Sequence, residues 1–297
     1  MTTSELLGRV QRLRTERTPF VLATVVRAQR PTSAKAGDSA LVLADGTVDG
    51  FVGGSCAEST VRLQGLRLLS TGESTLLRIT PSGEILDDGA AEGLVTVANP
   101  CLSGGTLEIF LEAMLPPPLV HVFGDAPVAQ ALARLGGALG YDVVTGLDRE
   151  VRPDACAVVV ASHGRDEEPV LRAALDSGVP YVALVASRRR GASVLSTLDI
   201  GGPERARVHS PAGLDIGART APEVALSILA EIVASRPKAP VAVAPAGPAV
   251  GSAVDPVCGM AVAVTPTALQ HEHAGKTWYF CGSGCRDAFA DSPERYA

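Results

Sequence analysis

Residues 119–132, LVHVFGDAPVAQAL, decide the fold of the second half of the chain. The first five are typical of a buried strand and Gly124 supplies a turn. The residues that follow have helical periodicity, with apolar side chains at Val128, Leu132, Leu135 and Leu139. Strand-like runs come next, near Val143 and at residues 157–161 and 181–185. This alternation predicts a Rossmann-like parallel sheet covered by helices.

The limits of this domain are marked by prolines and by one well-capped helix. Thr220-Ala-Pro-Glu223 supplies an N-cap threonine, a proline in the first turn and a capping-box glutamate. Pro116-Pro117-Pro118 precedes the domain, and the Pro/Ala-rich residues 237–254 follow it. We therefore expect a Rossmann-like domain over residues 118–236 and a linker over residues 237–254.

The first part of the chain, residues 1–115, has a different pattern. One helix is expected over residues 57–69, and glycine-rich turns separate short β-type runs at residues 20–26, 39–43, 94–98 and 106–111. This predicts an N-terminal α+β domain. With a small cysteine-based metal module over residues 255–297, the expected fold is α/β in three parts.

Composition narrows the classes of function. The 297 residues carry a formal net charge of −6. No basic run is longer than Arg188-Arg189-Arg190, which argues against a nucleic-acid partner. No apolar run approaches the roughly 20 residues that span a bilayer, and the first 20 residues lack the features of a secretory signal. A cytoplasmic protein without a membrane span is therefore expected.

Two segments of the Rossmann-like domain are candidates for binding phosphate. The turn at Gly124 would present backbone N–H groups, but Ala126 stands where a dinucleotide fingerprint has its second glycine, and Asp148 is only a weak match to a ribose-binding carboxylate. Ser187-Arg188-Arg189-Arg190 directly follows a strand, where α/β folds bind ligands, and guanidinium groups suit phosphates. The alternatives are a purely structural turn and a solvated basic turn.

Cysteines in glycine-rich turns are candidate reactive thiols. Gly53-Gly54-Ser55-Cys56 opens the expected helix, so the helix dipole would favour the Cys56 thiolate. Cys101 lies in a second such turn, NPCLSGG. Cys156, inside an apolar strand, is expected to be a small buried side chain.

The C-terminal segment has the spacing of a metal site. Cys258, Cys281 and Cys285 lie within about 30 residues, a set of thiolates that suits a tetrahedral soft-metal site. His271 and His273 lie between them, and spacing does not identify which, if either, is a fourth ligand. The alternative is a module of this type that no longer binds metal.

Four segments together resemble the xanthine dehydrogenase accessory protein family of the XdhC/CoxF type: residues 30–38 (RPTSAKAGD), 53–58 (GGSCAE), 101–108 (CLSGGTLE) and 210–218 (SPAGLDIGA). The first and third are closer to the branch associated with carbon monoxide dehydrogenase. The family's usual Gly-Ala-Gly turn is altered at Asp125 and Ala126. Residues 255–297 separately resemble a YHS domain, a relative of the TRASH metal-binding modules, in DPVCGM, YFC and PERY.

The resemblance implies a molybdenum cofactor chaperone rather than an enzyme. Such a protein binds molybdopterin or its dinucleotide form, assists its sulfuration with a cysteine desulfurase, and delivers it to an apo molybdenum hydroxylase such as carbon monoxide dehydrogenase or xanthine dehydrogenase. A homodimer is consistent with this role. Copper or zinc is implied at the YHS cysteines.

Site residues follow from the same resemblance and from the Rossmann-like geometry. Cys56 and Cys101 would lie near the metal end of the cofactor, and Gly53 and Gly54 are candidate cofactor-binding residues beside Cys56. The phosphate end would be bound by Gly124, Ser187, Arg188, Arg189 and Arg190.

Two other classes of function remain open from the sequence. A nicotinamide-dependent oxidoreductase would need an intact glycine fingerprint and a proton-transfer residue, for which His121 and His163 are the nearby histidines. A metal-sensing or scaffold protein would act through the YHS segment alone. Truncation at about residue 240 would then abolish all activation of a client.

Overall fold

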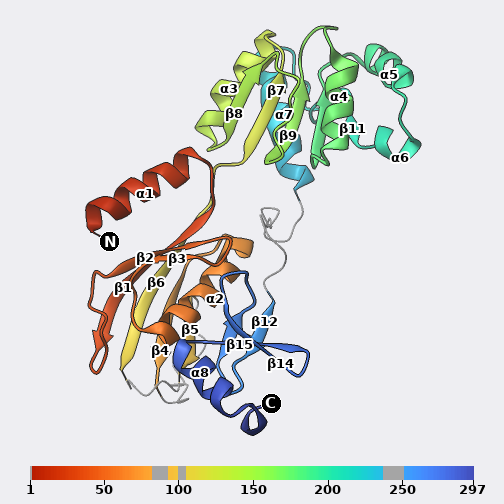
Figure 1. Cartoon of the computed structure of the whole chain (residues 1–297). Helices are drawn as coiled ribbons and strands as arrows, with labels where there is room; N and C mark the ends of the chain where they lie inside the picture. Colours follow the sequence, from red (N-terminus) through yellow and green to blue (C-terminus); the bar gives the residue numbers. More distant parts are fainter. Residues whose placement is uncertain (1, 82–92, 100–104, 237–250) are drawn as a thin grey trace. The chain divides into compact units, whose positions relative to one another are not determined.

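The computed structural model describes residues 2–81, 93–99, 105–236 and 251–297 (Figure 1). It divides into two compact units. Unit 1 joins Met1–Pro116 to Lys238–Ala297, and unit 2 is Pro117–Pro237. Two segments far apart in sequence therefore share unit 1, an association that the sequence did not predict.

The sheet of unit 1 has six strands in the order β3-β2-β1-β6-β4-β5. All neighbours are antiparallel except β4 and β5, which are parallel. Helix α2 (Ser55–Thr71) packs Val61 and Leu66 into the same apolar core as the inward-facing strand residues, and α1 (Thr3–Thr15) precedes the sheet. The strand bounds are β1 Phe20–Gln29, β2 Ser39–Leu43, β3 Val48–Gly50, β4 Thr75–Thr80, β5 Leu94–Ala98 and β6 Thr106–Met114.

Residues 251–297, which we call the C-terminal module, form two short antiparallel pairs and a helix. β12 (Ser252–Val254) pairs with β13 (Ala261–Ala263), and β14 (Leu269–His273) pairs with β15 (Lys276–Phe280). Helix α8 (Ser283–Asp291) and the 3-10 turn η1 (Pro293–Arg295) follow. β12 lies inside the stretch expected as linker.

An aromatic cluster forms one part of the core of the C-terminal module. Phe289 is fully buried and its ring lies 5.3 Å from the ring centroids of both Trp278 and Phe280. Ala263 of β13 instead joins the apolar core that α2 shares with the large sheet. The module is therefore packed partly on itself and partly on the rest of unit 1.

Unit 2 is a five-stranded parallel sheet in the order β11-β10-β9-β7-β8. Alternate strand residues face opposite sides, so one face packs on α3 (Pro127–Ala138) and α7 (Ala221–Ser235). The other face packs on α4 (Glu167–Asp176) and α5 (Arg188–Thr197), and α6 (Gly202–Arg205) precedes β11. The strands are β7 Leu119–Phe123, β8 Asp142–Gly146, β9 Ala155–Val160, β10 Tyr181–Leu184 and β11 Val208–His209.

This arrangement confirms the predicted α/β fold class with a Rossmann-like parallel sheet. One local interpretation changes. Residues 188–190, predicted as a phosphate-binding segment with a solvated basic turn as the alternative, form the first turn of α5, with Ser187 as its N-cap. Within the described residues, no helix is long and apolar enough to cross a membrane.

Candidate functional site

The three predicted metal-binding cysteines lie together. Cys258 is in the turn between β12 and β13, Cys281 directly follows β15, and Cys285 is in the first turn of α8. The Cys281 sulfur is 3.6 Å from that of Cys258 and 3.7 Å from that of Cys285. These three sulfurs and a carboxylate oxygen of Asp255 are all within 4.8 Å of one another.

Asp255 is a site residue that the sequence reasoning missed. Its carboxylate is fully buried: Oδ1 accepts hydrogen bonds from the backbone N–H groups of Val257 (2.9 Å) and Cys258 (3.4 Å), and Oδ2 accepts one from Cys281 N–H (2.8 Å). The sequence did carry a signal for this role: in DPVC, an aspartate side chain can accept a hydrogen bond from the backbone N–H two residues further on. The carboxylate thus fixes the two loops that carry Cys258 and Cys281.

The thiols of the cluster differ in acidity. The contact with Cys281 lowers the pKa of Cys258. The pKa of Cys281 is raised by its contacts with Cys258 and Cys56 and by burial. Burial also raises the pKa of Cys285, to about 12. Since thiolates are the metal ligands, a metal ion that binds here must displace the protons of Cys281 and Cys285.

Neither histidine of the module belongs to this group of donors. His271 and His273 lie on β14, and both rings pack edge-on against Phe289, at centroid distances of 5.8 and 6.0 Å. Among the described residues, the donor group contains Asp255 instead. The two histidines contribute to the aromatic core of the module.

The predicted thiol at the start of α2 lies beside this cluster. Cys56 follows the N-cap Gly54 by two residues, and its sulfur is 3.9 Å from that of Cys281. A pocket of about 170 Å³ adjoins Cys56 and is lined by Thr32, Ser33, Asn99 and Gly105, among others. Residues of segments 30–38 and 53–58 therefore meet here with Gly105 and Leu107 of the third segment. Cys101 itself lies outside the described residues.

Gly53 has a local structural reason to be glycine. Its φ is +137°, and a side chain there would come within 3.0 Å of the Ala57 Cβ. The chain needs this conformation to turn into α2 and set Cys56 in the first turn.

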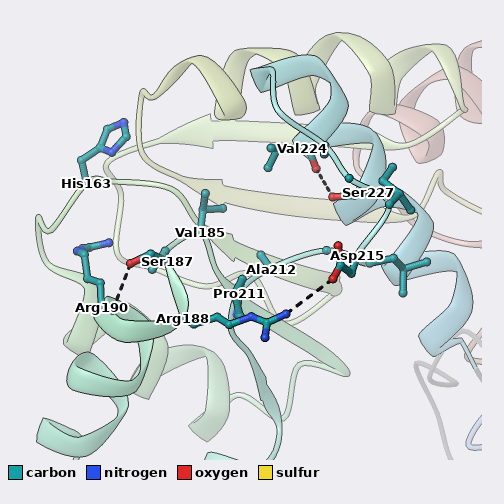
Figure 2. Close-up of a pocket in the computed structure, with 16 residues that line it drawn as sticks. His163, Val185, Ser187, Arg188, Arg190, Pro211, Ala212, Asp215, Val224 and Ser227 are labelled. Carbon is teal, nitrogen blue, oxygen red and sulfur yellow. Dashed lines mark hydrogen bonds and ion pairs between the residues drawn. The ribbon is translucent and has the colours of Figure 1, made fainter.

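Unit 2 carries an open pocket of about 650 Å³ (Figure 2). It lies at the carboxyl ends of β10 and β11, the edge of a parallel sheet where α/β folds bind ligands. The pocket is lined by His163, Ser187 and Arg188, by residues 211–218, and by Val224 and Ser227 of α7, among others. The volume is within the usual range for small-molecule sites.

The predicted arginines have different surroundings. Arg188 lines the pocket, and its highly exposed guanidinium forms a 3.7 Å ion pair with Asp215 (Figure 2). Arg190 also lines the pocket, but its guanidinium binds the buried carboxylate of Glu167. Arg189 is not a lining residue of this pocket. Of the three, Arg188 is the best placed to meet an anion.

The loop that lines the pocket is held by one carboxylate. Glu231 of α7 accepts hydrogen bonds from the Tyr181 hydroxyl (2.6 Å) and the Gly213 N–H (2.7 Å), and lies 3.0 Å from His209 Nδ1. Burial raises the pKa of Glu231, but these hydrogen bonds outweigh burial and lower it. Sequence reasoning missed Glu231 because it lies in an apolar helix and gains its partners only through the fold.

Of Gly124, His121 and His163, only His163 lines the pocket of unit 2. Gly124 has φ +128° and packs against the backbone of Ala161, and it does not line the pocket. Asp148 does not line it either. His121 is buried in β7, and desolvation lowers its pKa. His163 does line the pocket.

The fold and its sites define a two-unit α/β protein with a thiol cluster in one unit and a ligand-sized pocket in the other. Residues 13–80 match the XdhC and CoxI family, residues 120–232 match the XdhC Rossmann domain, and residues 253–297 match the YHS domain. The chain thus carries both XdhC domains followed by a YHS domain, as the sequence resemblance predicted. The matched family covers XdhC and CoxI together, so the carbon monoxide dehydrogenase branch stays a prediction.

Three relatives align with between 44% and 77% of this chain. YqeB of Escherichia coli (strain K12) is 28% identical over 260 residues, 77% of this chain and 46% of YqeB. The molybdenum cofactor insertion chaperone PaoD of the same organism is 24% identical over 264 residues, 73% of this chain and 83% of PaoD. A probable xanthine dehydrogenase subunit of Bacillus subtilis (strain 168) is 25% identical over 161 residues, 44% of this chain and 47% of that protein.

The chain thus spans about half the length of YqeB and of the B. subtilis protein. Among solved structures, a xanthine dehydrogenase from Bacillus halodurans aligns with a TM-score of 0.37 at 17% identity, covering 80% of this chain and 97% of that one.

Proposed function

We propose that this protein is a maturation factor that binds the molybdenum cofactor and delivers it to an apo molybdenum hydroxylase, such as carbon monoxide dehydrogenase or xanthine dehydrogenase. The observation that carries the proposal is the pocket of unit 2, which combines a ligand-sized volume with one exposed arginine at a strand end. The similarity to PaoD, named a molybdenum cofactor insertion chaperone, supports the same role.

The residues of the unit 2 pocket suit the phosphate end of such a cofactor. Arg188 offers a guanidinium, and the first turn of α5 offers backbone N–H groups and the positive end of a helix dipole. Ser187 caps that turn by accepting from Arg190 N–H (3.3 Å). When bound, the cofactor supplies the molybdenum and its pterin, whereas these residues bind and orient its phosphate.

The thiols are proposed to serve the metal chemistry. Cys56 and Cys101, with Gly53 and Gly54, are proposed near the metal end of the cofactor, where sulfuration with a partner cysteine desulfurase takes place. Cys258, Cys281 and Cys285 are proposed to bind copper or zinc, and their clustered sulfurs fit a soft ion. A homodimer acting in the cytoplasm completes the proposal.

A carbon monoxide dehydrogenase client favours copper in the C-terminal module, because that enzyme contains copper as well as molybdenum. The proposal is that the module carries or senses copper for this client. Metal-binding assays on the purified protein check it. Tight zinc binding with no copper binding would count against copper.

The oxidoreductase alternative loses support from the surroundings of Gly124. Its position is explained by close packing against Ala161, and it is not part of the pocket. The alternative requires tight binding of NAD(H) or NADP(H) to the purified protein. Binding of either in place of a pterin would overturn the chaperone proposal.

The test is purification from a host that makes the molybdenum cofactor, under anaerobic conditions, followed by assay of molybdenum and of oxidised pterin by fluorescence. Wild-type protein is compared with Arg188→Ala and with Arg134→Ala, an exposed arginine of α3, as the matched control. Loss of a charge-assisted hydrogen bond, worth about 1.5–3 kcal/mol, predicts roughly 10- to 100-fold weaker binding for Arg188→Ala only. Wild-type protein without pterin or molybdenum would refute the proposal.

A further inference from the structure

The contact between Cys56 and Cys281 joins parts of unit 1 that are 225 residues apart in sequence. Cys56 belongs to the first turn of α2, whereas Cys281 belongs to the C-terminal module. Neither the metal site of the module nor a thiol site at α2 requires the two sulfurs to meet. Neither site therefore explains why the two sulfurs lie only 3.9 Å apart.

The C-terminal module is seated on the rest of unit 1 by several separate contacts. Ala263 enters the core beneath α2. Gly282 approaches Ser55 so closely that a side chain at residue 282 would lie 2.7 Å from the Ser55 Oγ. Likewise, a side chain at Gly46 would lie 2.8 Å from Thr265. The sulfur contact is thus one part of a close-packed interface.

The sulfur separations match a tetrahedral metal site. Two thiolates bound to one tetrahedral ion at about 2.3 Å lie about 3.8 Å apart. The Cys281 sulfur lies 3.6, 3.7 and 3.9 Å from the sulfurs of Cys258, Cys285 and Cys56. Three edges of such a tetrahedron therefore already have the required length.

Two donors compete for the fourth position, Asp255 and Cys56. The Asp255 carboxylate already accepts three backbone N–H groups, which suits a group that orients ligands rather than one that binds the ion. Cys56 lies outside the set of donors that are all within 4.8 Å of one another, so its side chain must move closer to this set to complete the tetrahedron. A sulfur donor also matches the other three in softness.

The helix termini favour a cluster of thiolates at this point. Cys56 lies in the first turn of α2 and Cys285 in the first turn of α8. Each helix N-terminus carries a partial positive charge equivalent to roughly half an elementary charge. Because a divalent ion with four thiolates has a net charge of −2, the two helix ends offset part of that charge.

We propose that Cys56 is the fourth thiolate ligand of the metal site in the C-terminal module. One ion then links the module to α2 and binds the Cys56 sulfur, which also lines the pocket beside Thr32, Ser33 and Gly105. A ligand of that pocket that needs the Cys56 sulfur must displace it from the ion. This inference rests on the metal site of the proposed function.

The experiment titrates Co²⁺ into the reduced full chain and records the visible spectrum, because the d–d and sulfur-to-cobalt bands report the number of thiolates. Wild-type protein is compared with Cys56→Ser, with Cys258→Ser as the variant that removes a thiolate of the module itself, and with Cys156→Ser as the matched control in β9. We expect one four-thiolate ion per wild-type chain. Cys56→Ser should give a three-thiolate spectrum, with affinity lowered by more than the roughly 100-fold seen for groups that only orient ligands.

The outcomes separate this inference from the metal site itself. If Cys56→Ser keeps the wild-type spectrum and affinity while Cys258→Ser loses them, the metal site stands and the role of Cys56 is refuted. If wild-type protein binds no Co²⁺, the metal site fails, and the inference fails with it. The control Cys156→Ser must show the Co²⁺ spectrum and affinity of wild-type protein for the result to support the role of Cys56.

A second measurement uses only wild-type protein, in case Cys56→Ser does not fold. N-ethylmaleimide labelling of Cys56, read by mass spectrometry, should slow when Zn²⁺ is bound, as should labelling of Cys258. Cys56 labelling at the same rate with and without Zn²⁺, while Cys258 becomes protected, would overturn the inference.

Discussion

The backbone of Gly124 lies so close to Ala161 that a side chain at residue 124 would overlap the Ala161 carbonyl group. Gly124 follows β7 and Ala161 follows β9, and these two strands are neighbours in the sheet. The Ala161 N–H donates to the Phe123 carbonyl at 2.8 Å. The close approach keeps the two strand ends paired where the chain turns away from each.

Replacing Gly124 with alanine is therefore expected to destabilise unit 2. The φ of +128° and the overlap each cost about 1–3 kcal/mol, so a loss of about 2–6 kcal/mol is expected. Chemical denaturation followed by circular dichroism measures it. Gly137→Ala is the control, because nothing lies within 4 Å of its Cβ position in α3, and it should be neutral or slightly stabilising. Equal stability of the two variants would contradict the packing role of Gly124.

The Glu231 network predicts a specific pH dependence. Since folding lowers the pKa of Glu231, its contribution to stability is present above the unfolded value of about 4.5 and is lost as the pH falls through the folded pKa. Glu231→Gln should remove that contribution, costing about 1.5–3 kcal/mol near neutral pH and less in acid. Urea denaturation between neutral and acidic pH compares it with Glu150→Gln, an exposed control. A pH-independent difference between Glu231→Gln and wild type would refute the assignment.

Replacing Arg190 is expected to lower stability, whereas replacing Arg188 is expected to weaken ligand binding with little effect on stability. The Glu167 side chain is 4% exposed and binds Arg190, which is 37% exposed. In Arg190→Ala the Glu167 carboxylate loses its ion pair and keeps the hydrogen bond from the Gly164 N–H, at 2.9 Å. The expected cost is about 3 kcal/mol, at the low end for a broken buried pair because Arg190 is partly exposed.

Arg188→Ala removes only an exposed ion pair and should change stability by less than about 1 kcal/mol. Thermal unfolding of both variants checks the contrast. Wild-type stability in Arg190→Ala would show that the Glu167 pair contributes nothing.

Local sequence patterns predicted the parallel sheet well, because strand and helix periodicity are encoded in neighbouring residues. The first turn of α5 was harder to predict, since three consecutive arginines carry no apolar periodicity and only the Ser187 cap marks the helix start. Gly124 was ambiguous for another reason. A glycine that approaches a phosphate and one that approaches a backbone carbonyl look the same in sequence.

The candidate site was predicted in parts but not as an assembly. Spacing identified Cys258, Cys281 and Cys285 because they belong to one short module. The proximity of Cys56 to Cys281 depends on the packing of α2 against β13, which no local pattern encodes. Asp255 was missed because its partners are backbone N–H groups, one of them 26 residues away.

The Asp255 carboxylate accepts hydrogen bonds from backbone N–H groups of both loops of the metal site, so we expect it to set the affinity of that site for metal. Asparagine has the same size, but its NH₂ group cannot accept from the N–H of Cys258 or Cys281, so one of the two loops loses its anchor. Asp255→Asn should therefore weaken Zn²⁺ binding by roughly 10- to 100-fold with the thiolate number unchanged. Competition with a chromophoric chelator measures the affinity, and Asp291→Asn in α8 is the exposed control. If Asp255 were instead a metal ligand, the Co²⁺ spectrum of Asp255→Asn would show a changed donor type. If Asp255→Asn bound Zn²⁺ with the affinity of wild-type protein, both roles of Asp255 would be excluded.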